Sequence, residues 1–124
     1  MKIILSIKPE FVDKIFSGEK KYEFRKSIPK RLGISNVVVY STLPVGKVIG
    51  EFTFRKILSL TPNALWDITK DSSGITKEFF DDYFRDKSLA HAFEIDSFNL
   101  YSAYLDISEI LPSGLPPQSY CYID

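Results

Sequence analysis

The sequence predicts an α+β fold, in which a mixed, mostly antiparallel sheet forms a small β-barrel with helices covering its openings. The predicted elements follow the order strand, helix, several strands, two helices and several strands. Five or six strands with few crossovers favour antiparallel pairing, because parallel neighbours need long connections. The chain has 124 residues, and one domain spanning residues 1–124 accounts for this length.

The N-terminal segment predicts a buried strand followed by an amphipathic helix. Residues 2–7 are rich in Ile and Leu, which is typical of a short buried strand. Pro9 suits a first helical turn, where its missing N–H costs no hydrogen bond. Gly18 is placed to end the helix in a left-handed conformation. Four apolar side chains fall on one face of this helix: Phe11, Val12, Ile15 and Phe16.

The middle of the chain predicts three strands. Alternation around Tyr22 and Phe24 indicates that the first has one buried face, and three consecutive valines mark the second. The third strand is long and is predicted to bend at Gly50. The predicted strands span 20–26, 36–40 and 47–60, with a long connection at 27–35 and a turn at 41–46.

The C-terminal half predicts two short helices and then two more strands, with residues 119–123 as a candidate for a last short strand. Thr61 and Pro62 start the first helix, and Thr76 is the N-cap of the second, which ends near residue 86. Residues 96–100 are predicted to join two antiparallel strands. These two strands and the last one span 89–95, 101–110 and 119–123.

Composition excludes several classes of protein. Cys121 is the single cysteine, so we expect no internal disulfide and no disulfide-linked partner. His91 is the single histidine, and a Cys/His zinc site needs about four ligands, so we expect no metal of this kind and no cofactor. An all-carboxylate magnesium site stays open. With no signal peptide and no apolar run of about 18 residues, the sequence predicts a cytoplasmic protein without a membrane segment.

Charge is distributed unevenly along the chain. The formal net charge is zero, but residues 20–31 hold six basic side chains and one acid, Glu23. Residues 71–86 hold five acids and two basic side chains. A neutral protein lacks the broad positive field of a duplex-DNA binder, although a local basic patch attracts one or a few phosphates.

Residues 18–25 contain the best candidates for chemistry. In strand alternation Lys21, Glu23 and Arg25 share one face, whereas the direction of Lys20 is not determined by parity. Arg25 can hold a phosphate through two N–H groups, and burial can shift Lys20 toward neutrality. A desolvated Glu23 can act as a general base. The alternative is an exposed strand face with cross-strand ion pairs.

The order Gly-x-Lys-x-x-Glu-x-Arg, filled here by Gly18, Lys20, Glu23 and Arg25, resembles the signature of ASCH domains, a branch of the PUA-like superfamily. Similar segments extend over nearly the whole chain. They lie at residues 5–9, 40–44, 50–52, 66, 79–84 and 116–120.

The resemblance implies a small barrel with a cleft between barrel and helices, lined by the signature residues. Related PUA-like domains bind RNA or modified bases, so the implied partner is single-stranded RNA, a modified base or a nucleotide. Ser41 and Thr42 end a strand before a turn and are candidates for phosphate contacts, with simple turn chemistry as the alternative. Gln118 and Ser119 are candidates for the cleft floor.

Some ASCH-like proteins are described as ribonucleases, and others as amidohydrolases acting on N4-acetylcytidine. The implied amidohydrolase set is a Lys, a Thr three residues later and a Glu from a later segment. Lys20 matches the first position, but the second is Glu23, which has no hydroxyl to act as nucleophile. Glu78 is the candidate for the third position.

Three functions are therefore predicted. The first is an RNA- or nucleotide-binding domain that holds its ligand with Lys20, Glu23 and Arg25. The second is a hydrolase, either a ribonuclease or an amidohydrolase, that uses Lys20 and Glu23 as acid and base. The third is a protein-interaction or regulatory domain that uses the acidic helix at residues 76–86.

Overall fold

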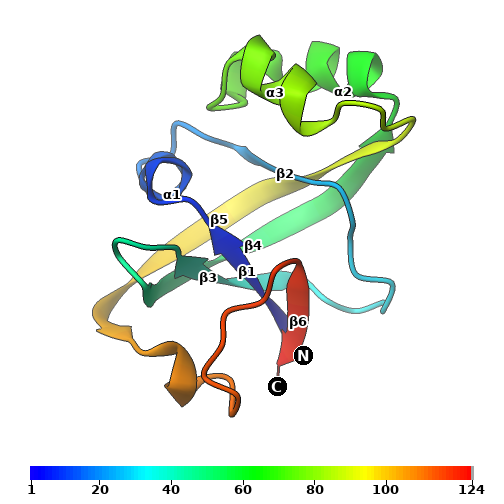
Figure 1. Ribbon diagram of the computed structural model, residues 1–124. Helices are drawn as coiled ribbons and strands as arrows, with labels where there is room; N and C mark the ends of the chain where they lie inside the picture. Colours follow the sequence, from blue (N-terminus) through cyan, green and yellow to red (C-terminus); the bar gives the residue numbers. More distant parts are fainter. Residues whose placement is uncertain (124) are drawn as a thin grey trace.

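The computed structural model describes residues 1–123, which form one six-stranded sheet and three α-helices (Figure 1). Along the sheet the strands follow the order β2-β5-β4-β3-β1-β6, and only the β1–β3 pair is parallel. The elements are β1 (Lys2–Ile7), α1 (Pro9–Phe16), β2 (Tyr22–Arg25), β3 (Asn36–Ser41), β4 (Lys47–Leu60), α2 (Pro62–Thr69), α3 (Lys77–Tyr83), β5 (Ala90–Leu105) and β6 (Tyr120–Ile123), with single 3₁₀ turns at Lys70–Ser72 and Ile107–Glu109.

The predicted mixed, mostly antiparallel sheet with helices is confirmed. Within residues 1–123, no backbone pairing joins the two outer strands, β2 and β6, so hydrogen bonds do not close the sheet into a barrel. The α2–α3 pair lies over the end of the long β4–β5 ribbon, as Figure 1 shows. No helix of the described residues is long and apolar enough to cross a membrane.

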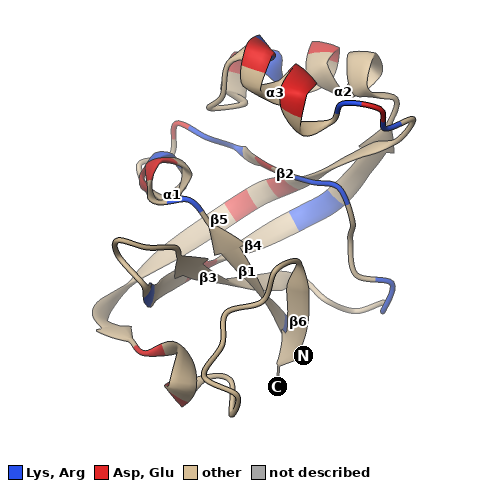
Figure 2. Cartoon of the chain, viewed as in Figure 1, with Lys and Arg blue, Asp and Glu red and all other residues tan. Residues whose placement is uncertain are grey.

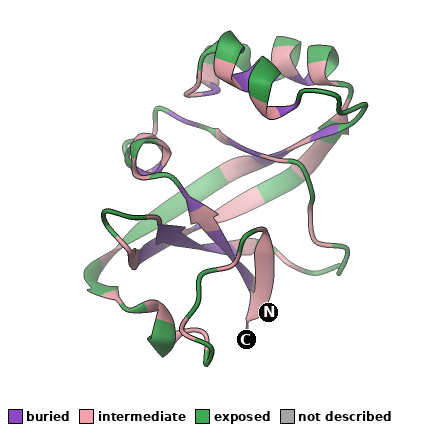
Figure 3. Cartoon of the chain, viewed as in Figure 1, coloured by how far each residue is buried: buried purple, intermediate pink, exposed green. Residues whose placement is uncertain are grey.

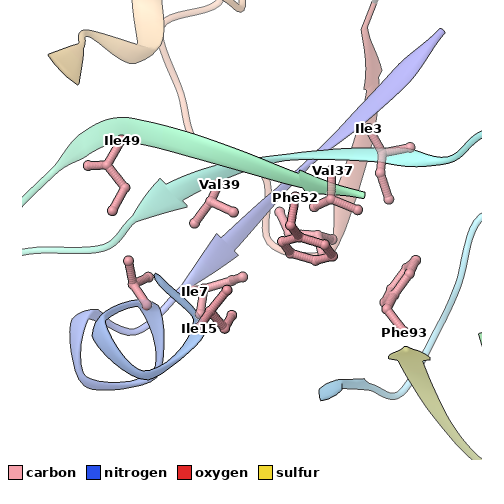
Figure 4. Close-up of a cluster of buried hydrophobic side chains, with 10 residues drawn as sticks. Ile3, Ile7, Ile15, Val37, Val39, Ile49, Phe52 and Phe93 are labelled. Atoms are coloured by element: carbon pink, nitrogen blue, oxygen red, sulfur yellow. The ribbon is translucent and has the colours of Figure 1, made fainter. Parts of the chain in front are cut away.

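Two apolar layers bury both faces of β1 and β3 (Figure 3). Ile3 and Val37 point into the main core, shown in Figure 4, whereas Ile4 and Val38 point into a second cluster on the opposite face. This double burial explains why both strands are continuous apolar runs rather than alternating ones. The main core includes residues from α1 and β5, so it also determines where α1 lies beside the sheet: Ile3, Leu5, Ile7, Val12, Ile15, Val37, Val39, Ile49, Phe52 and Phe93.

The prediction of two strands at 89–95 and 101–110 is wrong, because one 16-residue strand, β5, replaces them. Residues 96–100 do not turn away but stay paired with β4 through register shifts. Their polar side chains are satisfied across the strand pair: Thr53 Oγ1 lies 2.6 Å from Ser97 Oγ, and Arg55 pairs with Asp96 at 2.9 Å. The strand ends at Leu105, and Asp106 then caps a 3₁₀ turn.

The predicted bend at Gly50 coincides with a register shift between Val48 and Gly50. A Cβ atom at Gly50 would lie 2.5 Å from the Asn99 carbonyl oxygen and 2.9 Å from Cζ of Phe16. Close approach of β5 and α1 therefore requires glycine at this position.

Glu51 on β4 connects four strands through its carboxylate. It accepts hydrogen bonds from Lys2 Nζ at 3.1 Å, from Asn36 Nδ2 at 3.2 Å and from the Tyr101 hydroxyl at 2.8 Å. Burial alone would raise the pKa of Glu51, but the hydrogen bonds from Tyr101, Lys2 and Asn36 outweigh it and lower that pKa. The ionised carboxylate therefore stabilises the sheet.

We expect Glu51→Gln to lower the free energy of unfolding by about 1–2 kcal/mol at neutral pH. Because the folded pKa of Glu51 is depressed, its contribution is complete above the unfolded pKa and is lost as pH falls through the folded value. Urea unfolding at neutral pH and at about pH 3 should show the difference between variant and wild type shrinking in acid. Asp67→Asn, which changes an exposed acid on α2, is the control. A difference that persists in acid would contradict this account.

Candidate functional site

A cleft of ≈ 320 Å³ opens between the end of β1, α1, β2 and α3. One wall carries charged and polar groups from β2 and the residues beside it, and the opposite wall is largely aromatic. Twelve residues line it: Ser6, Ile7, Lys8, Phe11, Lys20, Glu23, Phe24, Arg25, Ile75, Phe79, Tyr83 and Gln118. The structure therefore brings Lys20, Glu23 and Arg25 together from one short segment of chain.

Lys20 is directed into the cleft by the turn that follows α1. Gly18 adopts a φ of 86°, and the Lys20 N–H donates to the Lys14 carbonyl at 2.9 Å. Lys20 Nζ donates to the Ser73 carbonyl at 2.7 Å and lies 4.7 Å from the centre of the Phe24 ring. Burial lowers the pKa of Lys20 to about 8, although the Glu23 carboxylate partly opposes this shift. At neutral pH most of the Lys20 amine is protonated, and the pH lies close to the midpoint of its titration.

Glu23 lies on β2, where it is paired in register with Phe93 of β5. Its burial raises the pKa of the carboxyl, and the neighbouring Lys20 and Arg25 only partly counteract the effect. Exposed fractions of 2% for Lys20 and 5% for Glu23 show that the alternative of an exposed charged strand face is wrong for these two residues. A cation and an acid therefore face one cleft, and desolvation drives each toward its neutral form.

Arg25 connects three segments of the chain. Its guanidinium donates to the Ser6 carbonyl at 3.2 Å, to the Ser119 carbonyl at 3.1 Å and to Glu23 Oε2 at 3.4 Å. A guanidinium has five N–H donors, so these three bonds leave two for a ligand. Arg25 therefore still has enough N–H groups for the predicted two-point contact with a phosphate. Its other N–H groups hold β1 and the residue before β6 in place.

The aromatic wall is the part of the cleft that the sequence analysis missed. Phe79 and Tyr83 lie one helical turn apart on α3, with their rings stacked at 6.3 Å and 12°. Phe11 meets Phe79 edge to face at 5.1 Å, and Lys8 Nζ lies 5.4 Å from the Phe79 ring centre. The available signal was the i, i+4 spacing of Phe79 and Tyr83, which places both rings on one face of the helix. Both rings are partly exposed and line the cleft, so a planar group that enters it can contact them.

Of the other residues predicted to bind a ligand, some line the cleft and some do not. Gln118 lines it, and Ser119 contributes its carbonyl to Arg25. Ser41 is buried at the end of β3, and neither it nor Thr42 lines the cleft. Gly18 lines a second, smaller cavity of ≈ 210 Å³ on the other side of the Lys20 segment.

Two residues considered from the sequence, Lys21 and Glu78, do not line the cleft. Lys21 was predicted to share a face with Glu23, but it is exposed and precedes the first residue of β2. Glu78 is exposed in the first turn of α3 and does not line the cleft, so the Lys–Glu–Glu set of the amidohydrolase alternative is not assembled. Within residues 1–123, no three His, Cys, Asp or Glu side chains gather closely enough to hold a metal ion.

A family model described as ASCH domain matches residues 5–99. The chain belongs to the ASCH domain family. It is 32% identical over 122 residues to the ASCH domain-containing ribonuclease of Zymomonas mobilis, which covers 97% of this chain and 82% of that protein. The crystal structure of ASCH from Zymomonas mobilis superposes with a TM-score of 0.90 and 29% identity, covering 99% of this chain and 87% of that one. Large ribosomal subunit protein uL22 of Ureaplasma parvum is 31% identical over 108 residues, which are 86% of this chain and 34% of that protein.

In this ASCH domain, three successive backbone carbonyls in the turn before α3 accept hydrogen bonds from three lysines. Those of residues 72, 73 and 74 accept from Lys21 N at 2.9 Å, Lys20 Nζ at 2.7 Å and Lys14 Nζ at 3.0 Å. A Cβ atom at Gly74 would lie 2.7 Å from Cβ and Cγ of Lys20, and Gly74 has a φ of 69°. The turn therefore closes over the Lys20 stem and excludes water from it.

We expect the Lys20 amine to titrate with a midpoint of about 8, because the cleft desolvates it. Glu23→Gln should lower this midpoint further, because the Glu23 carboxylate favours the charged amine. Lysine-selective NMR across the alkaline range measures both values. A Lys20 midpoint near 10.5, the ordinary value for lysine, or no response to Glu23→Gln, would overturn this description of the cleft.

Proposed function

We propose that this ASCH domain binds single-stranded RNA and holds one nucleotide of it in the cleft. The observation that carries the proposal is the pairing of a buried cation, Lys20, with two partly exposed aromatic rings, Phe79 and Tyr83, across one opening. Aromatic faces stack bases without regard to sequence, and cations contact the backbone, which is the usual recognition of unpaired nucleic acid.

The size of the cleft favours one nucleotide over a duplex. A volume of ≈ 320 Å³ lies at the lower end of the range for small-molecule sites, so a single flipped base with its sugar is the ligand that fits. The net charge of zero also argues against long-range attraction of duplex nucleic acid. Base access therefore requires an unpaired or extruded nucleotide.

Each polar group has a distinct role in this proposal. Lys20 has donors beyond its bond to Ser73, and Arg25 retains two N–H groups, so both are assigned to phosphate or sugar oxygens. Glu23 is assigned to a donor, either an amino or imino group of the base or the ribose 2′-hydroxyl.

Lys20→Met should weaken binding of a short, labelled single-stranded RNA by about tenfold to a hundredfold, since one charge-assisted contact is lost. Methionine keeps the apolar stem between Phe24 and Gly74 and should leave the fold intact. Fluorescence anisotropy with 2′-O-methyl RNA, which cannot be cleaved through its 2′-oxygen, isolates binding. Lys56→Met, an exposed lysine on β4, removes the same charge outside the cleft and should bind as wild type. Equal affinity in the wild type and Lys20→Met would end the proposal.

Cleavage of the bound strand is the second candidate. Two observations favour it: Glu23 and Lys20 have pKa values displaced toward each other in one cleft, and the chain is similar to a protein named as a ribonuclease. In this reaction Glu23 removes the proton of a 2′-hydroxyl, the 2′-oxygen attacks the adjacent phosphorus, and the bond from phosphorus to the 5′-oxygen breaks. Lys20 protonates the departing oxygen. The products are a 2′,3′-cyclic phosphate and a 5′-hydroxyl, and proton exchange with solvent restores both side chains.

Glu23→Gln should reduce cleavage by about 10²–10⁴-fold, because the general base is lost. It should weaken binding of 2′-O-methyl RNA far less, because the Gln amide oxygen still accepts a hydrogen bond. The rate should fall above about pH 8 as Lys20 loses its proton, and in acid as Glu23 gains one. Gel analysis of a labelled unmodified RNA across this pH range measures both limbs and identifies the cyclic end. Glu78→Gln, on the exposed face of α3, is the matched control. Cleavage that survives Glu23→Gln would remove Glu23 from the mechanism and leave the binding proposal standing.

A further inference from the structure

The connection that follows β2 carries three exposed cations close to the cleft. Lys26, Lys30 and Arg31 all lie within residues 26–31, here named the basic loop. None of the eight ion pairs among residues 1–123 includes any of these three side chains. Their charge is therefore not neutralised within the described part of the chain.

The basic loop is held against the body of the domain. Tyr122 of β6 accepts hydrogen bonds from the Lys30 N–H at 3.2 Å and the Arg31 N–H at 3.3 Å, and its ring lies 4.6 Å from the Arg31 guanidinium. Ser27 Oγ lies 2.9 Å from Ser119 Oγ, beside the carbonyl that receives Arg25. These contacts hold the backbone of the basic loop against the domain.

One end of the basic loop touches the cleft itself. Lys26 Nζ lies 4.8 Å from the ring centre of Tyr83, which lines the aromatic wall. The six residues from Lys26 to Arg31 extend over at most about 20 Å, a distance that a few nucleotides of single strand cover. The cations therefore form a short path that starts at the cleft opening.

The other rim of the cleft has the opposite charge. Exposed acids mark α3, where Asp81 pairs with Lys77 of the same helix and Asp82 pairs with Arg85, which follows the helix. Figure 2 shows basic segments along the connection after β2 and acidic turns on α3. The ion pairs partly neutralise the acids of α3, whereas the cations of the basic loop are unpaired within residues 1–123, so a polyanion that leaves the cleft is attracted mainly to the basic loop.

We infer that the basic loop is the surface along which the RNA strand continues after its bound nucleotide, so that the domain reads one nucleotide in the cleft and contacts the phosphates on one side of it. The inference rests on the proposed function, because it needs a nucleotide in the cleft. It adds a strand-tracking surface of three cations outside the cleft, at Lys26, Lys30 and Arg31.

The test compares a labelled nucleoside monophosphate with 2′-O-methyl uridine oligonucleotides of increasing length. The loop variant combines Lys26→Gln, Lys30→Gln and Arg31→Gln. The control combines Lys56→Gln, Lys70→Gln and Lys87→Gln, which remove the same charge from exposed positions away from the cleft. Thermal unfolding checks that both proteins are folded.

Wild type should bind longer oligonucleotides more tightly than the monophosphate. At low salt the loop variant should lose at least about tenfold more affinity for the oligonucleotides than for the monophosphate, because Lys26 touches Tyr83 of the cleft whereas Lys30 and Arg31 lie outside it. The salt dependence of oligonucleotide binding should drop by about two ions, since each phosphate contact on a single strand releases about 0.7 of an ion. The control should match wild type.

Three results would overturn the inference. Equal weakening in both triple variants would show a general charge effect, and affinity independent of length in wild type would show that nothing outside the cleft contacts the strand. In either case, monophosphate binding that Lys20→Met abolishes would leave the proposed function intact. If neither monophosphate nor oligonucleotide binds wild type, the proposed function fails and the inference falls with it.

Discussion

Burial of charge beside β2 is the constraint on which the rest of the site depends. Lys20 and Arg25 are removed from water, so their N–H groups must find acceptors within the protein. They find backbone carbonyls in β1, in the turn before α3 and in the residue before β6, three segments far apart in the sequence. The same hydrogen bonds that satisfy the cations therefore position the walls of the cleft. The charged strand both forms the site and holds the surrounding segments in place.

Such an arrangement is hard to explain as a device for stability. Apolar side chains of similar volume often replace a buried ion pair at no cost, whereas desolvation here displaces the pKa of Lys20 downward and that of Glu23 upward. Glu51 shows the contrast. It lies away from the cleft, receives three donors and has a lowered pKa, which is the pattern of a stabilising carboxylate. Two carboxylates of one sheet therefore show opposite pKa shifts, because the charged form of Glu51 is stabilised and that of Glu23, in the cleft, is not.

Local patterns were sufficient to predict most of the sheet but not the cleft. Apolar runs located β1 and β3, and capping residues located α2 and α3, because these signals act over a few neighbouring residues. The unbroken β5 was missed because its polar centre is satisfied by β4, some 44 residues away at Thr53 and Ser97. The direction of Lys20 was undetermined for the same reason, since its acceptor is Ser73, 53 residues distant. Side chains whose partners are remote in sequence cannot be oriented by alternation alone.

Salt screens the exposed cations of this domain much more than the buried one. Mobile ions screen the exposed charges of residues 26–31 over about 8 Å at physiological salt, but they barely reach Lys20 inside the cleft. In the proposed complex, attraction of a strand therefore depends on ionic strength, whereas the contact that positions its nucleotide depends on the protonation of the Lys20 amine. A domain with no net charge can in this way combine weak, salt-dependent tracking with a local site that responds to pH. Salt and pH separate the two contributions without any change of sequence.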